Sequence, residues 1–373
     1  MTPEAVLKSI DLPPPSACGR VVVAMSGGVD SSVVAALLAH GGYDVVGITL
    51  QLYDQGARAA RKGACCAGQD IYDAKTVAET IGFPHYVLDY ESRFRETVID
   101  DFADSYLRGE TPVPCVQCNR EVKFKDLLQT ARDLGAQALA TGHYVRRIQT
   151  NEGAQLHQAV DLNRDQSYFL FGTTQEQLDF LRFPLGGLPK SDTRDLAAFF
   201  GLGVSEKPDS QDICFVAGGS YADVVARLRP ESLTPGDIVH EDGRILGTHQ
   251  GIIQFTVGQR RGLGISSPEP LFVIRLDPRT HQVIVGPQSA LARTILSLRA
   301  VNWIGPQEFP DSQEVTVKIR SSQKGGASSL TLSPQGKAQV TLNAPEYGIA
   351  SGQACVFYDG TRVLGGGWIE GTA

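Results

Sequence analysis

The sequence predicts an α/β protein in which a doubly wound domain with a mostly parallel sheet is followed by two small β-rich domains. In the first part of the chain, short apolar runs alternate with segments whose apolar residues recur at helical spacing. This is the pattern of buried parallel strands and of the helices that cover them. Beyond Pro208, turn-forming stretches such as TPGD, EDGR and YDGT separate short alternating runs such as EVTVKIR. That texture is typical of antiparallel β domains, in particular small barrels.

The predicted strands of the first domain are short and mostly apolar. They lie, in chain order, at residues 21–25, 44–52, 85–90 and 137–144. The first of them, VVVAM, is apolar throughout, as expected of a strand that is covered on both faces. Helical segments separate the strands, and this alternation predicts a parallel sheet.

The predicted helices of this domain lie at residues 31–40, 70–82, 122–135 and 193–202. Gly41 follows the first helix, Gly82 ends the second and Gly201 closes the last. Glycine is common at these positions because it readily adopts the left-handed conformation that terminates a helix.

The predicted domain boundaries follow these changes of texture. We expect a Pro-rich N-terminal extension at residues 1–19, the α/β domain at 20–207, a central β-rich domain at 208–278 and a C-terminal β-barrel domain at 279–373. The last boundary falls at the turn formed by Asp277 and Pro278.

Composition limits the class of protein. The chain has 373 residues, 42% of them hydrophobic and 20% charged, which is typical of a globular protein with two or three domains. It has no apolar run near the ~20 residues that span a bilayer, and its start lacks a signal-peptide pattern. We therefore expect a cytoplasmic protein without a membrane partner, in which the seven cysteines are free, metal-bound or catalytic. The net charge of −7 gives no overall attraction for nucleic acid, so such a partner would contact local basic patches.

A glycine- and serine-rich stretch, SGGVDSS at residues 26–32, joins the first predicted strand to the first helix. Glycines there let backbone N–H groups approach an anion, and the helix N-terminus adds positive potential. A Walker A loop would carry a lysine after its glycines, and none follows here, which excludes a P-loop NTPase at this position.

Two cysteines, Cys115 and Cys118, form a C-x-x-C motif in the stretch PVPCVQCNREVKFK. The spacing fits half of a zinc site, a dithiol redox pair or the sulfur-handling part of a catalytic centre. The local sequence leaves these three alternatives open.

The stretch SGGVDSS resembles the PP-loop motif S-G-G-x-D-S of the ATP pyrophosphatase superfamily, whose fold is of the adenine nucleotide alpha hydrolase type. The resemblance implies that the chain binds ATP with Mg²⁺, adenylates a carbonyl oxygen and releases pyrophosphate. It also implies a set of nucleotide-binding residues, of which Asp30 would lie near the phosphates and their Mg²⁺. These residues are Ala24, Met25, Ser26, Gly27, Gly28, Val29, Asp30 and Ser31.

Further stretches, among them CNREVKF, ATGHY, DQSYFL, DSQDICF and GQRRGLGI, resemble the tRNA-specific 2-thiouridylase family from about Gly19 to the C-terminus. The family places sulfur on C2 of the wobble uridine of certain tRNAs. The resemblance implies that Leu50 and Gly142 contact the adenosine of ATP. It further implies that Cys118 is the nucleophile and that Cys214 receives a persulfide. Adenylation of the C2 oxygen makes it a good leaving group, which a sulfur nucleophile then displaces.

The same resemblance implies two partners, the tRNA substrate and a sulfur donor, either a persulfide carrier protein or hydrosulfide. The tRNA-contact residues would be His143, Arg164, Asp165, Gln166, Arg320, Ser321 and Gln353. The wobble base must leave its stack to react, and Tyr144, Tyr168 and Phe169 are candidate stacking partners.

The chain departs from the family pattern at Cys115, where many members carry an aspartate. The cysteines Cys115, Cys118 and Cys214 then offer three thiolates, enough to hold a [4Fe–4S] cluster with one open iron that delivers hydrosulfide. A closed zinc site is less suited to three cysteines without a nearby pair of histidines. The chemistry of three thiolates favours the cluster slightly over the persulfide relay, and both routes stay open on the sequence.

Two other functions are weighed against thiolation. A PP-loop ligase or amidotransferase that acts on a small molecule would not need the C-x-x-C motif, DSQDICF or a long β-rich tail. A zinc-stabilised RNA-binding module without catalysis would leave SGGVDSS without a purpose.

Overall fold

A computed structural model of the chain describes residues 2–53, 67–208, 213–216, 219–306, 312–333 and 335–373. The described residues divide into two compact units. The first unit comprises Met1–Thr97, Cys115–Ala217 and Thr361–Val363, and the second comprises Val98–Pro114, Gly218–Gly360 and Leu364–Ala373. Most of DSQDICF and the pair Cys65–Cys66 lie outside the described residues.

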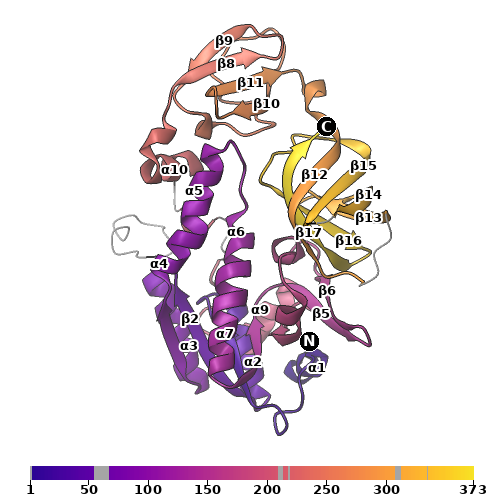
Figure 1. The fold of residues 1–373 in the computed structure, drawn as a ribbon. Coiled ribbons are helices and arrows are strands. Elements are labelled where there is room, and N and C mark those ends of the chain that lie inside the picture. The colour runs from indigo at the N-terminus through magenta and orange to yellow at the C-terminus, as the bar shows by residue number, and fades with distance from the viewer. Residues whose placement is uncertain (1, 54–66, 209–212, 217–218, 307–311, 334) are drawn as a thin grey trace. The chain divides into compact units, whose positions relative to one another are not determined.

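The first unit contains the predicted parallel sheet, so the α/β fold class is confirmed (Figure 1). The strand order is β3-β2-β1-β4-β7, and all of these neighbours pair in parallel. The strands are β1 (Arg20–Ala24), β2 (Asp44–Gln51), β3 (His85–Asp89), β4 (Ala136–Thr141) and β7 (Leu181–Arg182). Because β1 lies between β2 and β4, the chain order reverses beside β1, and α/β sheets bind ligands at the carboxyl ends of strands at such a point.

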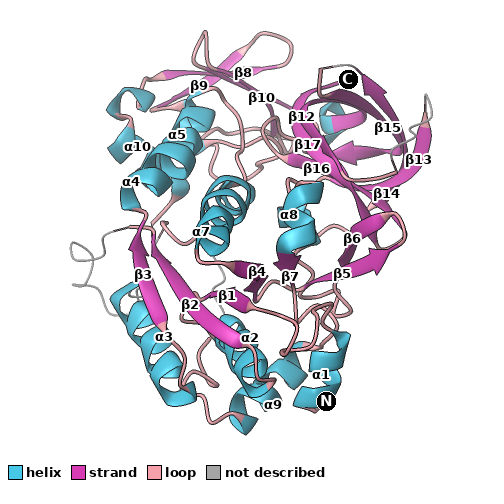
Figure 2. Cartoon of the chain, turned by 60° about the horizontal axis from the view of Figure 1, so that its bottom comes forward, coloured by secondary structure: helices cyan, strands magenta, loops and turns pink. Residues whose placement is uncertain are grey.

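Helices cover both faces of this sheet, as a doubly wound fold requires. Figure 2 shows α2 (Val29–His40), α3 (Ala67–Ile81) and α9 (Lys190–Phe199) on one face and α7 (Leu128–Asp133) on the other. Helix α2 is buried along most of its length, from Ser31 to Leu38, because it packs against the sheet, α3, α9 and the N-terminal helix α1 (Pro3–Ser9). Burial of so many Val, Leu and Ala side chains makes this helix the centre of the core.

The N-terminal extension adds to the same core. Val6 of α1 is completely buried and Cys18 nearly so. Arg147 forms an ion pair with Asp11, and the Arg182 guanidinium donates to the Asp11 carbonyl.

The sequence reasoning assigned no element to residues 91–121, and this was wrong. The structure has α4 (Glu91–Phe94), α5 (Asp100–Leu107) and α6 (Pro114–Gln117), together with π-helical segments at Arg95–Ile99 and Cys118–Leu127. The helix predicted to begin at residue 122 therefore begins at Pro114. Proline fits the first turn of a helix, where its missing N–H costs no hydrogen bond, so Pro114 starts this helix.

The rest of the first unit consists of short elements. These are the hairpin β5 (Val145–Thr150) and β6 (Gly153–Gln158), the 3₁₀ turn Ser167–Leu170 and α8 (Gln175–Phe180).

The second unit holds the β-rich part of the chain. One sheet has the order β10-β11-β8-β9 and encloses a small apolar core. Its strands are β8 (Gly236–His240), β9 (Ile245–His249), β10 (Phe272–Asp277) and β11 (Gln282–Gly286), preceded by α10 (Tyr221–Leu228).

A closed barrel follows, in the order β12-β15-β14-β13-β16-β17, and β17 pairs back onto β12. Its strands are β12 (Ala292–Trp303), β13 (Gln313–Lys318), β14 (Gly326–Ser333), β15 (Lys337–Tyr347), β16 (Ala354–Asp359) and β17 (Arg362–Thr372). Within the described ranges, no helix is long and apolar enough to cross a membrane.

Candidate nucleotide and sulfur site

The glycine-rich stretch forms a tight loop between β1 and α2. Gly28 is the N-cap of α2 and provides no side-chain cap, so the first N–H groups of the helix are available to an anion. The Ser31 hydroxyl accepts a hydrogen bond from the Ser26 N–H at 3.0 Å and lies 3.2 Å from the Ser26 hydroxyl. Because Met25 and Val29 have buried side chains, they can offer a ligand only backbone groups.

Gly27 is the position in this loop where glycine is required. Its φ is +74°, and a Cβ atom there would lie 2.0 Å from the carbonyl oxygen of Asp70 in α3. The loop therefore packs its backbone directly on the start of α3.

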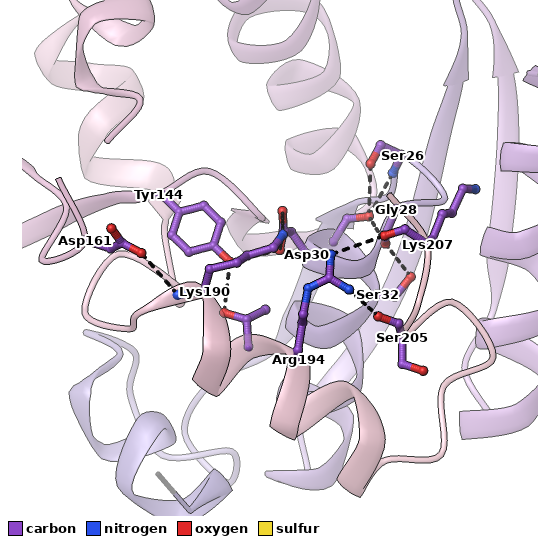
Figure 3. A network of polar contacts seen from close by, with 12 residues as sticks. Ser26, Gly28, Asp30, Ser32, Tyr144, Asp161, Lys190, Arg194, Ser205 and Lys207 are labelled. Atoms are coloured by element: carbon purple, nitrogen blue, oxygen red, sulfur yellow. Dashed lines mark hydrogen bonds and ion pairs between the residues drawn. The ribbon is translucent and has the colours of Figure 1, made fainter. Parts of the chain in front are cut away.

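Lys207, which is distant from the loop in the sequence, holds the loop in place. Its ammonium donates to the Gly27 carbonyl at 2.9 Å, to Asp70 at 2.7 Å and to Asp73 at 2.5 Å. Helix α9 supports this segment, because the Arg194 guanidinium donates to the Ser205 carbonyl at 2.8 Å (Figure 3).

The carboxylate of Asp30, in the first turn of α2, is the centre of a second polar network (Figure 3). Lys190 donates to both of its oxygens, at 2.7 and 2.9 Å. The Tyr144 hydroxyl donates to Asp30 Oδ1 at 2.9 Å and lies 2.9 Å from the Thr193 hydroxyl.

The end of β4 lies against the phosphate loop. A Cβ atom on Gly142 would be 2.9 Å from the Ser31 nitrogen, so the absence of a side chain allows this close approach. His143 follows, and its Nδ1 lies 2.8 Å from the Thr141 hydroxyl. Leu50 is half-buried near the end of β2, on the other side of β1. The residues predicted to hold the nucleotide thus gather at the carboxyl ends of β1, β2 and β4.

The cysteines Cys115, Cys118 and Cys214 also belong to the first unit, and all three are free thiols. Cys118 is buried, whereas Cys115 and Cys214 are exposed at the surface. Desolvation by the surrounding protein raises the pKa of each thiol, that of Cys214 to about 12, where the neighbouring thiols Cys118 and Cys115 also contribute. Lys123 acts in the opposite direction and lowers all three pKa values. The three sulfurs and this ammonium are therefore within electrostatic range of one another.

The π-helical segment explains the position of Lys123. A π-helix bonds residue i to residue i+5, so Lys123 follows Cys118 by one hydrogen-bonded turn. Burial and the charge of Lys123 also lower the pKa of His143 to about 3, which keeps this imidazole neutral at physiological pH. The rings of His143 and Phe124 are 5.7 Å apart.

The metal expectation can be tested against these positions. Among the described residues, no group of three or more His, Cys, Asp or Glu side chains is arranged to hold a metal ion. The thiols Cys115, Cys118 and Cys214 thus do not form a cluster site in this structure. Mg²⁺ needs fewer protein ligands, because it is commonly bound by one or two carboxylates together with substrate phosphates. Asp30 can supply one such carboxylate.

The predicted tRNA contacts of the first unit have different surroundings. Asp165 accepts hydrogen bonds from the Ala159 and Ser167 N–H groups and from the Ser167 hydroxyl. The Gln166 side chain accepts from the Tyr144 N–H at 2.8 Å. These two side chains shape the loop, whereas Arg164 is half-buried beside it.

The predicted tRNA contacts of the second unit lie on or near the barrel. Arg320 donates to the carbonyls of Tyr347 and Gly348 at 2.6 and 2.9 Å, and Ser321 is exposed. The amide oxygen of Gln353 is buried and has no hydrogen-bond partner within the described part of the chain. A buried acceptor of this kind favours a ligand that donates a hydrogen bond.

One expectation about base stacking was wrong. Tyr144 and Tyr168 are each only 3% exposed, so their rings are packed in the protein and are not free to stack on a base. Phe169 is half-buried.

The site lysines were missed by sequence reasoning. Lys123, Lys190 and Lys207 were not among the predicted site residues. Lys190 lies outside the helix predicted at residues 193–202, and the structure places it as the first residue of α9, where the helix dipole disfavours a cation. A residue that breaks a local rule in this way often has a functional reason.

Comparisons with known proteins show the family to which the chain belongs. Family models match in three blocks: "tRNA methyl transferase HUP domain" at residues 19–218, "tRNA methyl transferase PRC-barrel domain" at 222–287 and "Aminomethyltransferase beta-barrel domain" at 293–369. A protein of Paracoccus denitrificans named tRNA-specific 2-thiouridylase MnmA is 61% identical over 372 residues, which is 99% of this chain and 96% of the relative. One of the same name from Rhodospirillum centenum is 64% identical over 94% of this chain and 91% of its own length. The chain therefore belongs to the tRNA-specific 2-thiouridylase family.

Proposed function

We propose that this chain uses ATP to replace the C2 oxygen of the wobble uridine of tRNA with sulfur. The observation that carries the proposal is the contact between the cysteine-bearing segment and the strand end at the phosphate loop. The π-helical segment that begins at Cys118 contains Phe124, whose ring lies 5.7 Å from that of His143, and Gly142, next to His143, packs on the N-terminus of α2. A sulfur centre and a nucleotide loop in one unit favour sulfur transfer to an ATP-activated substrate.

The first step is activation of the base. The uridine C2 oxygen attacks the α-phosphorus of ATP, the bond to the β-phosphate breaks, and pyrophosphate leaves. The N–H groups at the start of α2 stabilise negative charge on the phosphates. Asp30 would hold Mg²⁺, and the bound ion would supply charge neutralisation for the departing pyrophosphate.

The second step is sulfur transfer. The terminal sulfur of a Cys214 persulfide attacks C2, and the bond from C2 to the adenylated oxygen breaks to release AMP. The Cys118 thiolate then attacks Cys214 Sγ, which frees 2-thiouridine and leaves a Cys118–Cys214 disulfide. Hydrosulfide that attacks this disulfide restores the Cys214 persulfide and the Cys118 thiolate. A persulfide carrier protein restores it instead after a thiol reductant has opened the disulfide.

Lys123 has a supporting role in this step. Burial holds the thiol pKa values high, and a nearby ammonium favours the thiolate that must attack. We route no step through a [4Fe–4S] cluster, because Cys115, Cys118 and Cys214 are not arranged as metal ligands.

The test uses the purified chain with ATP, Mg²⁺, a sulfide source and unmodified tRNA. We expect 2-thiouridine in the digested tRNA and pyrophosphate in solution in equal amounts. No pyrophosphate would contradict the enzyme assignment altogether. Pyrophosphate without 2-thiouridine would favour a different PP-loop ligase.

A further inference from the structure

Lys190 reaches the phosphate loop from a distant part of the sequence. Its ammonium binds both oxygens of Asp30, 160 residues earlier in the chain. Lys190 is 8% exposed, and the side chain of Asp30 is 31% exposed. Figure 3 shows this pair between α9 and the start of α2, beside the Tyr144 ring.

The position of Lys190 is unfavourable on two counts. It is a nearly buried cation, and burial of an ion pair brings a desolvation penalty that often exceeds the attraction between the charges. It is also the first residue of α9, whose dipole repels a positive charge there. Stability alone therefore does not account for a lysine at this position.

The surrounding bonds present this cation to the loop. Thr193, one turn further along α9, is fully buried and bonds to the Tyr144 hydroxyl, which in turn bonds to Asp30. The backbone N–H of Lys190 donates to Asp161 at 3.3 Å. The first turn of α9 is thus fixed against the first turn of α2, where the N-terminal N–H groups are available to bind phosphate.

We propose that Lys190 is the phosphate-binding lysine of this nucleotide site. Without nucleotide, Asp30 holds the Lys190 ammonium in place. When Mg²⁺ binds the Asp30 carboxylate, the ammonium is released and binds the triphosphate of ATP. This inference rests on the proposed use of ATP. A Walker A loop carries a phosphate-binding lysine in its own sequence, and SGGVDSS has none. Lys190 would supply this missing cation.

If Mg²⁺ displaces the Lys190 ammonium from Asp30, removal of the lysine should weaken the binding of ATP and strengthen the binding of a divalent cation. In Lys190→Gln, ATP loses an ionic hydrogen-bond partner and should bind about 10-fold or more weakly. AMP and adenosine, which lack the terminal phosphates, should bind within about twofold of the parent chain. Mn²⁺ as a Mg²⁺ probe, without nucleotide, should bind several-fold more tightly, because it no longer competes with the ammonium for Asp30.

The experiment measures dissociation constants of ATP, AMP and adenosine by calorimetry and of Mn²⁺ by its electron paramagnetic resonance signal. Lys8→Gln, at an exposed lysine of α1, is the charge-matched control and should change none of them. Asp30→Asn should lose the Mn²⁺ site. Lys190→Arg should recover part of the ATP affinity, and it keeps the test open if the glutamine variant does not fold.

The outcomes separate this inference from the proposed function. Equal weakening of ATP and adenosine in Lys190→Gln, or unchanged ATP affinity, would overturn the role of Lys190. Weaker Mn²⁺ binding by Lys190→Gln would show that the Lys190 ammonium and the divalent cation do not compete for Asp30. If the parent chain binds ATP and obeys these predictions but makes no 2-thiouridine, the Lys190 inference stands and the thiolation proposal fails.

Discussion

The carbonyl oxygen of Gly27 accepts a hydrogen bond from the ammonium of Lys207 at 2.9 Å, across 180 residues of sequence. The same ammonium binds Asp70 and Asp73 at the start of α3. One lysine thus fixes the backbone of the phosphate loop to a neighbouring helix.

Replacing this lysine should loosen the loop. Lys207→Met leaves two partly buried carboxylates and a carbonyl without their donor, and we expect a loss of about 1–3 kcal/mol in the free energy of unfolding. The control is Lys75→Met in the same helix α3, because Lys75 forms an exposed pair with Glu79 at 3.7 Å and such pairs contribute about 0–1 kcal/mol. Urea denaturation of both variants checks the difference. If both variants lose the same free energy of unfolding, Lys207 does not stabilise the phosphate loop.

The two loop glycines should differ in their tolerance of a methyl group. Gly27→Ala places Cβ against the Asp70 carbonyl at a positive φ, and we expect a loss of about 2 kcal/mol or more in the free energy of unfolding. Gly28→Ala has an ordinary φ of −90°, and the nearest atom to its Cβ is the Ser26 hydroxyl at 3.5 Å. It should lose less than about 1 kcal/mol. If Gly27→Ala proves as stable as Gly28→Ala, the described loop conformation is wrong.

The two proposed sulfur-transfer cysteines should separate the two half-reactions. Cys118→Ala and Cys214→Ala should each lower 2-thiouridine formation by roughly 10³-fold or more, the scale of a lost nucleophile. Both should still release pyrophosphate in single-turnover assays, because the thiols take no part in adenylation. Cys18→Ala, at a buried core cysteine of the same unit, should keep both activities. Thiolation that survives without Cys118 would remove this residue from the mechanism.

The third cysteine decides between relay and cluster. Because the relay uses only two sulfurs, Cys115→Ala should retain thiolation, and the parent chain purified without oxygen should be active without iron when a persulfide donor supplies the sulfur. Iron analysis and an absorbance scan of that preparation provide the measurement. An iron-containing parent that loses both iron and activity on Cys115→Ala would establish the cluster instead.

Acid should destabilise the fold through two partly buried histidines. Desolvation and the nearby charge of Lys123 lower the pKa of His143 from 6.5 to about 3, and desolvation and two arginines lower that of His157 to about 4. The unfolded chain therefore binds more protons below pH 6.5, and stability should fall progressively as the pH drops from about 6.5 toward 3. Urea denaturation should show a shallower acid slope for His143→Gln than for the parent chain, with parallel curves above pH 7.5. An unchanged acid slope would mean that His143 is accessible to protons in the folded chain.

The strands were predictable because parallel strands covered on both faces are read as continuous apolar runs. Predicted strand 44–52 and observed β2 (Asp44–Gln51) differ by one residue. Helix boundaries were harder: the helix predicted at 193–202 runs from Lys190 to Phe199, because Pro189 serves as its N-cap. The hairpin β5–β6 was missed, since its strands carry many polar side chains and lack a clear apolar run.

The same distinction applies to the site. The phosphate loop is contiguous in sequence, so its residue types and its place after a strand predicted an anion site. Lys190 and Lys207 lie 160 and 180 residues from their partners in the loop, and no local pattern connects them. The position of Lys123 depends on a π-helical turn, which the sequence reasoning did not anticipate.

The central claim is that ATP activates the C2 oxygen of uridine before sulfur replaces it. The most direct measurement uses an anticodon stem-loop RNA with ¹⁸O at C2 of the wobble uridine, incubated with the chain, ATP, Mg²⁺ and sulfide. We predict that mass spectrometry will find one ¹⁸O atom in AMP for each 2-thiouridine formed and none in pyrophosphate. Label in orthophosphate or water, with unlabelled AMP, would contradict the adenylation mechanism.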